Sequence, residues 1–117
     1  MTTTDIGRGA EELAADYLIS KGFKILTRNW RTRWCEIDIV AQKGQRIHFV
    51  EVKYRKDLSH GSGLDYITKT KMRQLKNAAL FWVGEKDWDG DYQIDVISVD
   101  GEFDPKLTYV SSAIPIN

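Results

Sequence analysis

Asp38, Glu51 and Lys53 are charged residues set within two runs that are otherwise rich in Ile, Val and Phe. The runs, residues 35–41 and 46–53, are separated by a polar segment that contains a glycine, a pattern typical of a β-hairpin. Carboxylates on neighbouring strands can share one metal ion, and a lysine beside them can stabilise negative charge that develops in a reaction. The hairpin therefore predicts a metal site on a rigid scaffold.

The turn of this hairpin decides which residues face each other. With Gly44 as the first residue of a two-residue type II′ turn, Asp38 lies directly opposite Glu51, and Glu36 lies opposite Lys53. Side chains alternate between the two faces of a strand, so Glu36 and Asp38 are expected on one face. Opposed residues have Cβ atoms roughly 4.5–5.5 Å apart, which is within reach of a single cation.

Oxygen ligands of this kind favour a hard cation. Mg²⁺ or Mn²⁺ keeps several waters and binds through few carboxylates plus substrate phosphates. Such a cation lowers the pKa of a bound water and polarises a phosphoryl oxygen, while Lys53 is expected to orient that water or to stabilise charge at phosphorus. The backbone carbonyl of Val52 is a further candidate ligand, because it requires no particular side chain.

A structural explanation of the same charges is also open at this point. Glu36 and Lys53 can form a cross-strand ion pair on a solvated face of the sheet. Against this, Asp38 and Glu51 repel each other without a cation, and the apolar Phe49 shares the face of Glu51. A half-buried acidic pocket is unfavourable unless something occupies it, which favours the metal site.

The composition indicates a single soluble domain. At 117 residues, with 42% hydrophobic and 29% charged residues, the chain has the length of one domain, 1–117, with a core at about 6–110. No apolar run approaches the roughly 18 residues of a membrane span, and the first residues lack the features of a signal peptide. Cys35 is the only cysteine, which excludes an internal disulfide and a cysteine-based zinc site. We expect a cytoplasmic protein.

The formal net charge of zero conceals a segregation of charge along the chain. Residues 21–56 contain ten Lys or Arg against three acids, and residues 84–117 contain eight acids against two lysines. A basic segment around the carboxylates can attract phosphates, although a solvated mixed surface explains the charge equally well. Arg and Trp are interleaved in residues 30–34, which suits phosphate contacts and base stacking, or simple packing of the tryptophans under a loop.

An amphipathic helix is predicted over residues 6–21. Apolar residues recur there at intervals of three and four, and Gly22 is a natural stop. At about 100° per residue, Glu12 points away from the apolar stripe and Glu11 lies at its border. Glu11 is therefore placed to reach over the edge of the core toward the sheet, while Glu12 is ordinary surface.

The remaining segments complete a mixed sheet flanked by helices. Three further strands and a second helix are predicted, at residues 23–29, 92–99, 107–110 and about 68–83. The strand at 92–99 is nearly continuous in apolar residues and is expected in the interior of the sheet. The Gly/Ser-containing loop at 54–64 is a candidate lid or substrate-contacting loop. His60 in this loop is a candidate ligand or proton shuttle, against the plainer interpretation of a solvated side chain, and it is left out of the site. The element order α-β-β-β-α-β-β predicts a single α/β domain.

Asp38 followed by Glu51-Val52-Lys53 resembles the D…(D/E)-x-K signature of the restriction-endonuclease-like nuclease superfamily. More closely, residues 7–99 resemble the small bacterial UPF0102 (YraN-like) family. The matching motifs are Glu11-x-x-Ala14-Ala15-x-Tyr17-Leu18, Asn29-Trp30-Arg31, Glu36-Ile37-Asp38-Ile39, Phe49-Val50-Glu51-Val52-Lys53-Tyr54-Arg55, Lys71, Ala79 and Asp95-Val96-Ile97. The chain departs from the family pattern at Ala10 and Cys35, where the family usually has glycine.

The resemblance implies a nuclease fold similar to that of archaeal Holliday-junction resolvases. In those enzymes a helix glutamate joins the Asp, Glu and Lys of the core motif, and Glu11 matches it. The resemblance thus implies Asp38 and Glu51 as metal ligands, Glu11 as an outer or additional ligand, and Lys53 as the catalytic lysine. We expect substrate phosphates to be contacted by Arg31, Arg33, Arg55 and Lys71.

The sequence therefore predicts a Mg²⁺- or Mn²⁺-dependent DNA endonuclease for branched or otherwise structured DNA, in DNA repair or recombination, without a membrane partner. A symmetric homodimer suits an enzyme that cuts two strands. The alternative is a nucleic-acid-binding or scaffold protein that keeps the nuclease fold without catalysis.

Overall fold

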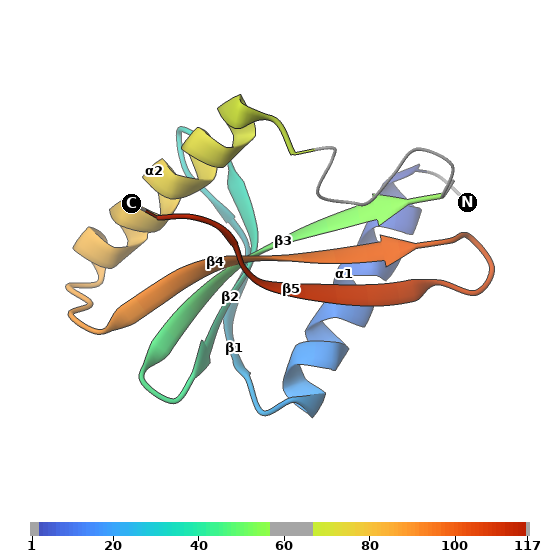
Figure 1. Ribbon diagram of the computed structural model, residues 1–117, viewed down its shortest axis with the longest axis horizontal. Coiled ribbons are helices and arrows are strands. Elements are labelled where there is room, and N and C mark those ends of the chain that lie inside the picture. Colours follow the sequence, from blue (N-terminus) through green and yellow to red (C-terminus); the bar gives the residue numbers. More distant parts are fainter. Residues whose placement is uncertain (1–2, 57–66, 117) are drawn as a thin grey trace.

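The computed structural model describes residues 3–56 and 67–116 (Figure 1). The elements follow in the order α1 (Thr3–Ser20), β1 (Lys24–Arg31), β2 (Glu36–Lys43), β3 (Arg46–Arg55), α2 (Lys69–Glu85), β4 (Asp91–Asp100) and β5 (Lys106–Ile114). This order confirms the predicted α-β-β-β-α-β-β arrangement of a single α/β domain.

The five strands form one mixed sheet in the spatial order β1-β2-β3-β4-β5. Strand β3 pairs with β4 in parallel, and the other neighbours are antiparallel. A parallel pair needs a long crossover, which α2 provides. Residues 93–99 of β4 are all buried, as predicted for an interior strand.

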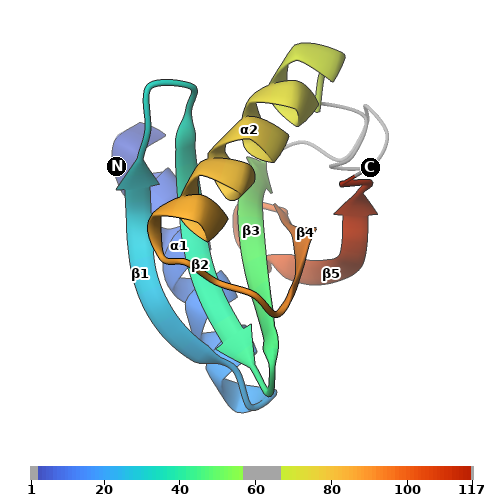
Figure 2. The same ribbon diagram turned by 90° about the vertical axis from the view of Figure 1, so that its left-hand side faces the viewer.

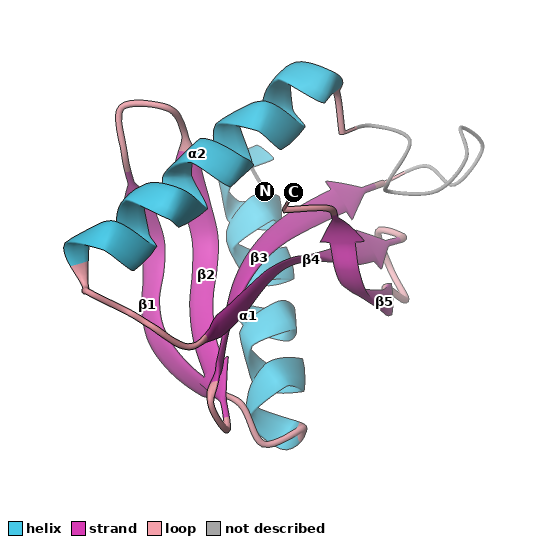
Figure 3. Cartoon of the chain, turned by 60° about the vertical axis from the view of Figure 1, so that its left-hand side comes forward, coloured by secondary structure: helices cyan, strands magenta, loops and turns pink. Residues whose placement is uncertain are grey.

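The two helices cover opposite faces of this sheet, so the domain has three layers (Figures 2 and 3). We call the buried residues under α1 the α1-side core: Ala10, Ala14, Ala15, Leu18, Phe23, Ile39, Ala41, Val50, Ile97 and Val99. We call those on the other face the α2-side core: Ile37, Val40, Ile47, Phe49, Ile67, Leu75, Ala78, Ala79, Trp82, Ile94, Val96 and Ile114.

Local chemistry fixes where each helix begins or ends. Gly22 has a φ of 91°, and its N–H and that of Phe23 donate to the carbonyls of Ile19 and Leu18, which is a Schellman motif. This motif ends α1 and brings Phe23 back onto the core. At the start of α2, the Thr68 hydroxyl accepts a hydrogen bond from the backbone N–H of Lys71 and caps the helix.

Several boundaries differ from the prediction, and β3 continues to Arg55, into the predicted loop at 54–64. Trp30 and Arg31, predicted as part of a connector, are the last residues of β1, and the final strand continues to Ile114. Trp30 is partly buried and packs against the α2-side core, and its ring centroid lies 6.1 Å from that of the exposed Phe81. The predicted lid at 54–64 and His60 fall largely in residues 57–66, outside the described residues. Neither described helix has the length and apolar character needed to cross a membrane.

Candidate functional site

The hairpin of β2 and β3 has the predicted register. The antiparallel ladder runs from the Lys43–Arg46 pair beside the turn to the Ile39–Val50 pair. Gly44 has a φ of 61°, as the first loop position of a type II′ turn requires. The next residues along the two strands, where the ladder stops, are Asp38 and Glu51. The sequence therefore predicted correctly which two acids meet.

The regular alternation of side chains between the two faces of the sheet breaks at Asp38. Its Oδ2 accepts a hydrogen bond of 2.7 Å from the backbone N–H of Val52. Ile37 packs in the α2-side core and Ile39 in the α1-side core, although regular alternation would put both on one face. The expectation that Glu36 and Asp38 share one face therefore fails, because alternation does not continue through Asp38.

Asp38, which is half-buried, and Glu51, which is buried, form an acid pair. Glu51 is 5% exposed. Burial, followed by a hydrogen bond with Glu51 and by the charge of Glu51, raises the pKa of Asp38 to about 8, against smaller opposing effects of the Val52 N–H and Lys71. The pair therefore holds a proton near neutral pH, because ionising both carboxylates in this position costs free energy.

Lys71 brings a positive charge to the acid pair from the other side. Its Nζ lies 3.3 Å from Oε2 of Glu51, and this contact ties the first turn of α2 to β3. Burial opposes its charge, but the Glu51 carboxylate outweighs burial and raises the pKa of Lys71. Lys71 was predicted as a phosphate contact, and the structure places it on a proposed metal ligand. Sequence spacing gave no sign of this pairing, which depends on how α2 packs.

Glu11 reaches the same region from α1. The side-chain amide of Asn29, oriented with its nitrogen toward the acids, donates to Oε1 of Glu11 and to Oε1 of Glu36, both at 2.8 Å. Burial and then the charge of Asp38 raise the pKa of Glu11, against the charge of Arg28. The predicted reach of Glu11 toward the sheet is confirmed. Asn29 is the bridging residue that sequence reasoning missed, although its motif was noted.

Glu12 behaves as ordinary surface, as predicted. Its Oε1 lies 2.7 Å from Nη1 of Arg28, in an exposed ion pair between α1 and β1. This ion pair neutralises one basic residue of the 21–56 segment. Such exposed pairs contribute little to stability.

Lys53 lies two residues beyond Glu51 on β3 and pairs in the ladder with Ser98 of β4. The alternation of the strand gives Lys53 and Glu51 the same face. Lys53 is partly buried. Its neighbour Val52 lies beside Asp38 through the N–H contact, and the direction of its carbonyl stays a prediction.

The three arginines predicted to contact phosphate have different surroundings. The exposed Arg31 lies 3.4 Å from Glu36, and the guanidinium of Arg33 lies 4.9 Å from the Trp34 ring. Arg55 is different, because only 10% of its side chain is exposed and its Nε donates to Asp100 Oδ1 at 2.7 Å. The structure thus brings Arg55 to the end of β4 rather than to an open surface.

The donor set tests whether a divalent cation fits. Across residues 3–56 and 67–116, no three His, Cys, Asp or Glu residues are grouped to hold a metal ion. The acids that do meet, half-buried Asp38 and buried Glu51, offer only oxygen and repel each other enough to retain a proton. Two oxygen donors of this kind match Mg²⁺ or Mn²⁺, which completes its shell with water and substrate oxygens. The residues fit such an ion as a two-carboxylate site.

Comparisons with known proteins point to one family. The model of the uncharacterised protein family UPF0102 matches residues 10–99. A UPF0102 protein of Vibrio campbellii is 40% identical over 97 residues, which cover 80% of each chain. A UPF0102 protein of Carboxydothermus hydrogenoformans is 44% identical over 85 residues, covering 73% of this chain and 72% of the relative. One of Thermodesulfovibrio yellowstonii is 35% identical over 113 residues, covering 97% and 98%.

Proposed function

This chain belongs to the UPF0102 family, as its motifs predicted, and on that premise we propose that it is a divalent-metal-dependent endonuclease. Its substrate is branched or otherwise structured DNA, in which it hydrolyses phosphodiester bonds. The observation that carries the proposal is the pairing of half-buried Asp38 with buried Glu51 where the β2–β3 ladder stops. A sheet gains nothing structurally from two acids that must share a proton, whereas a cation site needs them.

The residues of the acid pair take distinct roles in this proposal. Asp38 and Glu51 hold the cation, and the carbonyl of Val52 is a further candidate ligand. A bound Mg²⁺ or Mn²⁺ supplies the positive charge that polarises a phosphoryl oxygen and lowers the pKa of a water. The N–H of Val52 fixes the Asp38 carboxylate in place. Glu11 acts as an outer carboxylate through its bridge with Asn29.

Lys53 is the proposed catalytic lysine. It shares the face of Glu51, two residues along β3, so its ammonium is positioned to orient the attacking water or to stabilise charge at phosphorus. Lys53 is not needed to neutralise Glu51, because Lys71 already pairs with that carboxylate.

Substrate phosphates are the proposed partners of the basic segment around the site. Arg31 is exposed on β1, and Arg33 follows it in the connector to β2. Both come shortly before Asp38 in the sequence and can contribute to a surface that binds a DNA strand. Two sites in a symmetric homodimer would suit cleavage of both strands of a junction.

The experiment is a cleavage assay with linear, forked and four-way-junction DNA, in Mn²⁺, in Mg²⁺ and in chelator. We expect metal-dependent cutting that both Asp38→Asn and Lys53→Ala abolish, while Lys69→Ala, an exposed lysine of α2, cuts normally. Folding of each variant is checked by circular dichroism. The branched substrates should be cut faster than linear DNA.

A defined result contradicts the nuclease. If no substrate is cut in either metal, and if salt-sensitive DNA binding is tight and unchanged in Asp38→Asn and Lys53→Ala, the protein is a nucleic-acid-binding or scaffold protein that retains the fold. Binding alone would leave the pairing of Asp38 with Glu51 unexplained, which is why cleavage is the expected outcome.

A further inference from the structure

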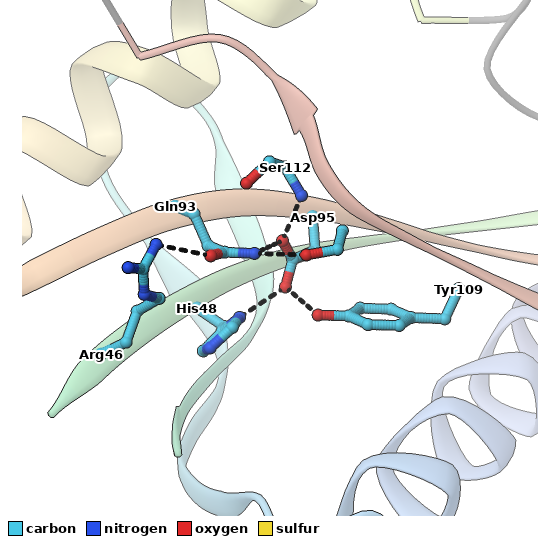
Figure 4. Close-up of polar contacts among 7 residues, drawn as sticks. Arg46, His48, Gln93, Asp95, Tyr109 and Ser112 are labelled. Carbon is cyan, nitrogen blue, oxygen red and sulfur yellow. Dashed lines mark hydrogen bonds and ion pairs between the residues drawn. The ribbon is translucent and has the colours of Figure 1, made fainter. Parts of the chain in front are cut away.

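A second polar group lies on the α1 side of the sheet, away from the acid pair. Asp95 on β4 is fully buried and accepts four hydrogen bonds, shown in Figure 4. They come from His48 Nδ1 at 2.7 Å, the Tyr109 hydroxyl at 2.6 Å, Gln93 Nε2 at 2.7 Å and the backbone N–H of Ser112 at 2.8 Å. We call Asp95 and these partners the Asp95 network.

The charge state of Asp95 fixes the orientation of His48. Burial opposes ionisation of Asp95, but the hydrogen bonds, first those from His48 and Tyr109, outweigh it and lower the pKa of Asp95. An ionised carboxylate only accepts hydrogen bonds, so Nδ1 of His48 is the protonated nitrogen. Its Nε2 is then the atom left to meet a ligand, in the same way that a carboxylate orients a functional imidazole.

Part of the Asp95 network supports the fold. The β4–β5 register shifts between Ile94 and Val96, and Ser112 has a φ of 51°. The bond from the Ser112 N–H to Asp95 compensates the interrupted ladder there. This role explains the carboxylate, but it requires no histidine opposite it and no pocket in front of that histidine.

His48 lines a pocket of about 350 Å³. The pocket is built from the end of α1, the start of β1, the two sides of the β2–β3 turn and β5, with Tyr17, Lys21, Phe23, Lys43, His48 and Tyr109 on its walls. Its volume is in the range of small-molecule sites, and its walls combine aromatic rings with a few polar groups, as such sites do. The Phe23 ring meets the His48 ring edge-on at 4.8 Å and holds it in place.

Two lysines concentrate positive charge at this pocket. The Nζ of Lys21 lies 5.7 Å from the Tyr17 ring centroid and that of Lys43 lies 5.0 Å from the Phe23 ring centroid. Both ammonium groups are thus drawn onto the walls of the pocket instead of extending into solvent. Among the residues that the structure describes, no carboxylate forms a salt bridge with either lysine. The positive charge is available to an anion.

We propose that this pocket binds a phosphate monoester that also carries an aromatic group, such as a nucleobase. The phosphate is received by the ammonium groups of Lys21 and Lys43, the aromatic part packs against Tyr17 and Tyr109, and the ring of His48 lines the pocket beside them. A monoester carries close to two negative charges at neutral pH, and the two ammonium groups match this charge better than they match the single charge of a carboxylate. A free nucleoside monophosphate and the 5′-phosphorylated end of a DNA strand share this chemistry.

The pocket is independent of the proposed nuclease site. Lys43 and His48 flank the turn of the hairpin, whereas Asp38 and Glu51 lie where its ladder stops at the other end. Binding at the pocket should therefore need no divalent metal, and it can be measured in the presence of chelator.

The test is a titration of ¹⁵N-labelled protein, in chelator, with dAMP, deoxyadenosine and inorganic phosphate. We expect dAMP to shift the amide signals of Phe23, Lys43 and His48 and to bind about tenfold more tightly than either fragment. Lys21→Ala and Lys43→Ala, both exposed and therefore expected to fold, should each weaken dAMP binding about fivefold or more. Lys69→Ala is the matched control and should bind normally.

A second arm identifies the source of the phosphate. A short single-stranded oligonucleotide is titrated with and without a 5′-phosphate. Pocket shifts that depend on the 5′-phosphate assign the strand end, and shifts with dAMP alone assign a free nucleotide. The proposal is overturned if about 10 mM dAMP leaves the pocket signals unchanged, or if the double variant of Lys21 and Lys43 binds dAMP as the unsubstituted protein does.

Discussion

The ammonium of Lys71 lies 3.3 Å from the carboxylate of Glu51 and joins the first turn of α2 to the centre of the sheet. Among the residues that the structure describes, it is the one ion pair made by Asp38 or Glu51. Its positive charge also lowers the pKa of Asp38, against the larger effects of burial and Glu51. Lys71 therefore favours ionisation of Asp38.

Lys71→Met tests this effect. The methionine keeps most of the apolar stem and removes the charge, so we expect the pKa of Asp38 to rise above its value of about 8. The measurement is a ¹³C NMR titration of the side-chain carboxyls. Lys69→Met, two residues earlier in the same turn, should leave the titration of Asp38 as it was, and an equal effect of both substitutions would contradict a direct contact.

The pH dependence of stability should carry the signature of Asp38. Its pKa is raised in the folded protein from an unfolded value of 3.8 to about 8, so between these pH values the folded state binds more protons. Stability contributed by this group is therefore present at low pH and is lost as pH rises toward 8. We expect urea unfolding in chelator to show a loss on the order of 1–3 kcal/mol between pH 5 and 8. Asp38→Asn should flatten that slope, and a slope that persists in this variant would assign it to other groups.

Divalent metal should reverse the destabilisation at high pH. A cation bound by Asp38 and Glu51 favours their ionised forms and stabilises the folded state by mass action, by about 2.7 kcal/mol at a hundredfold excess over Kd. Thermal unfolding at pH 8 with increasing Mn²⁺ should show a rising Tm. Asp38→Asn and Glu51→Gln should lose this response, whereas Glu12→Gln should keep it. A Tm that rises equally in all variants would indicate binding elsewhere.

Substitutions of Arg55 and Arg31 should have different effects, the first on stability and the second on DNA binding. Arg55 is nearly buried against Asp100, and this contact outweighs burial and lowers the pKa of Asp100. Arg55→Met should therefore cost about 3 kcal/mol of stability, measured by urea unfolding. Arg31→Ala, at an exposed site, should leave stability within about 0.5 kcal/mol and weaken DNA binding. A stable Arg55→Met variant with weakened DNA binding would restore Arg55 as a phosphate contact.

The sequence predicted the parts of the site that depend on local chemistry. The glycine turn at Gly44 fixes the register, and the register brings Asp38 to Glu51. The helix period placed Glu11 at the border of its apolar stripe, and the structure joins it to Glu36 through Asn29. These relationships need only neighbours along one strand, one hairpin or one helix.

The parts that were missed depend on contacts between distant elements. The break in alternation at Asp38 comes from a side chain that takes the backbone N–H of Val52, and no strand period contains that information. His48 and Asp95 looked like members of two apolar strands, and only the parallel pairing of β3 with β4 brings them together. Propensity and period do not report such pairings.

The short turns between β1, β2 and β3 have a consequence for how the protein assembles. Asp38 and Glu51 meet within a local hairpin, while the parallel pairing of β3 with β4 joins residues such as Arg46 and Asp91 across the whole of α2. Contacts between residues close in sequence form ahead of distant ones, because closing a short loop costs less entropy. The chain is therefore expected to bring its two carboxylates together early in folding, before β4 completes the core whose burial raises the pKa of Asp38.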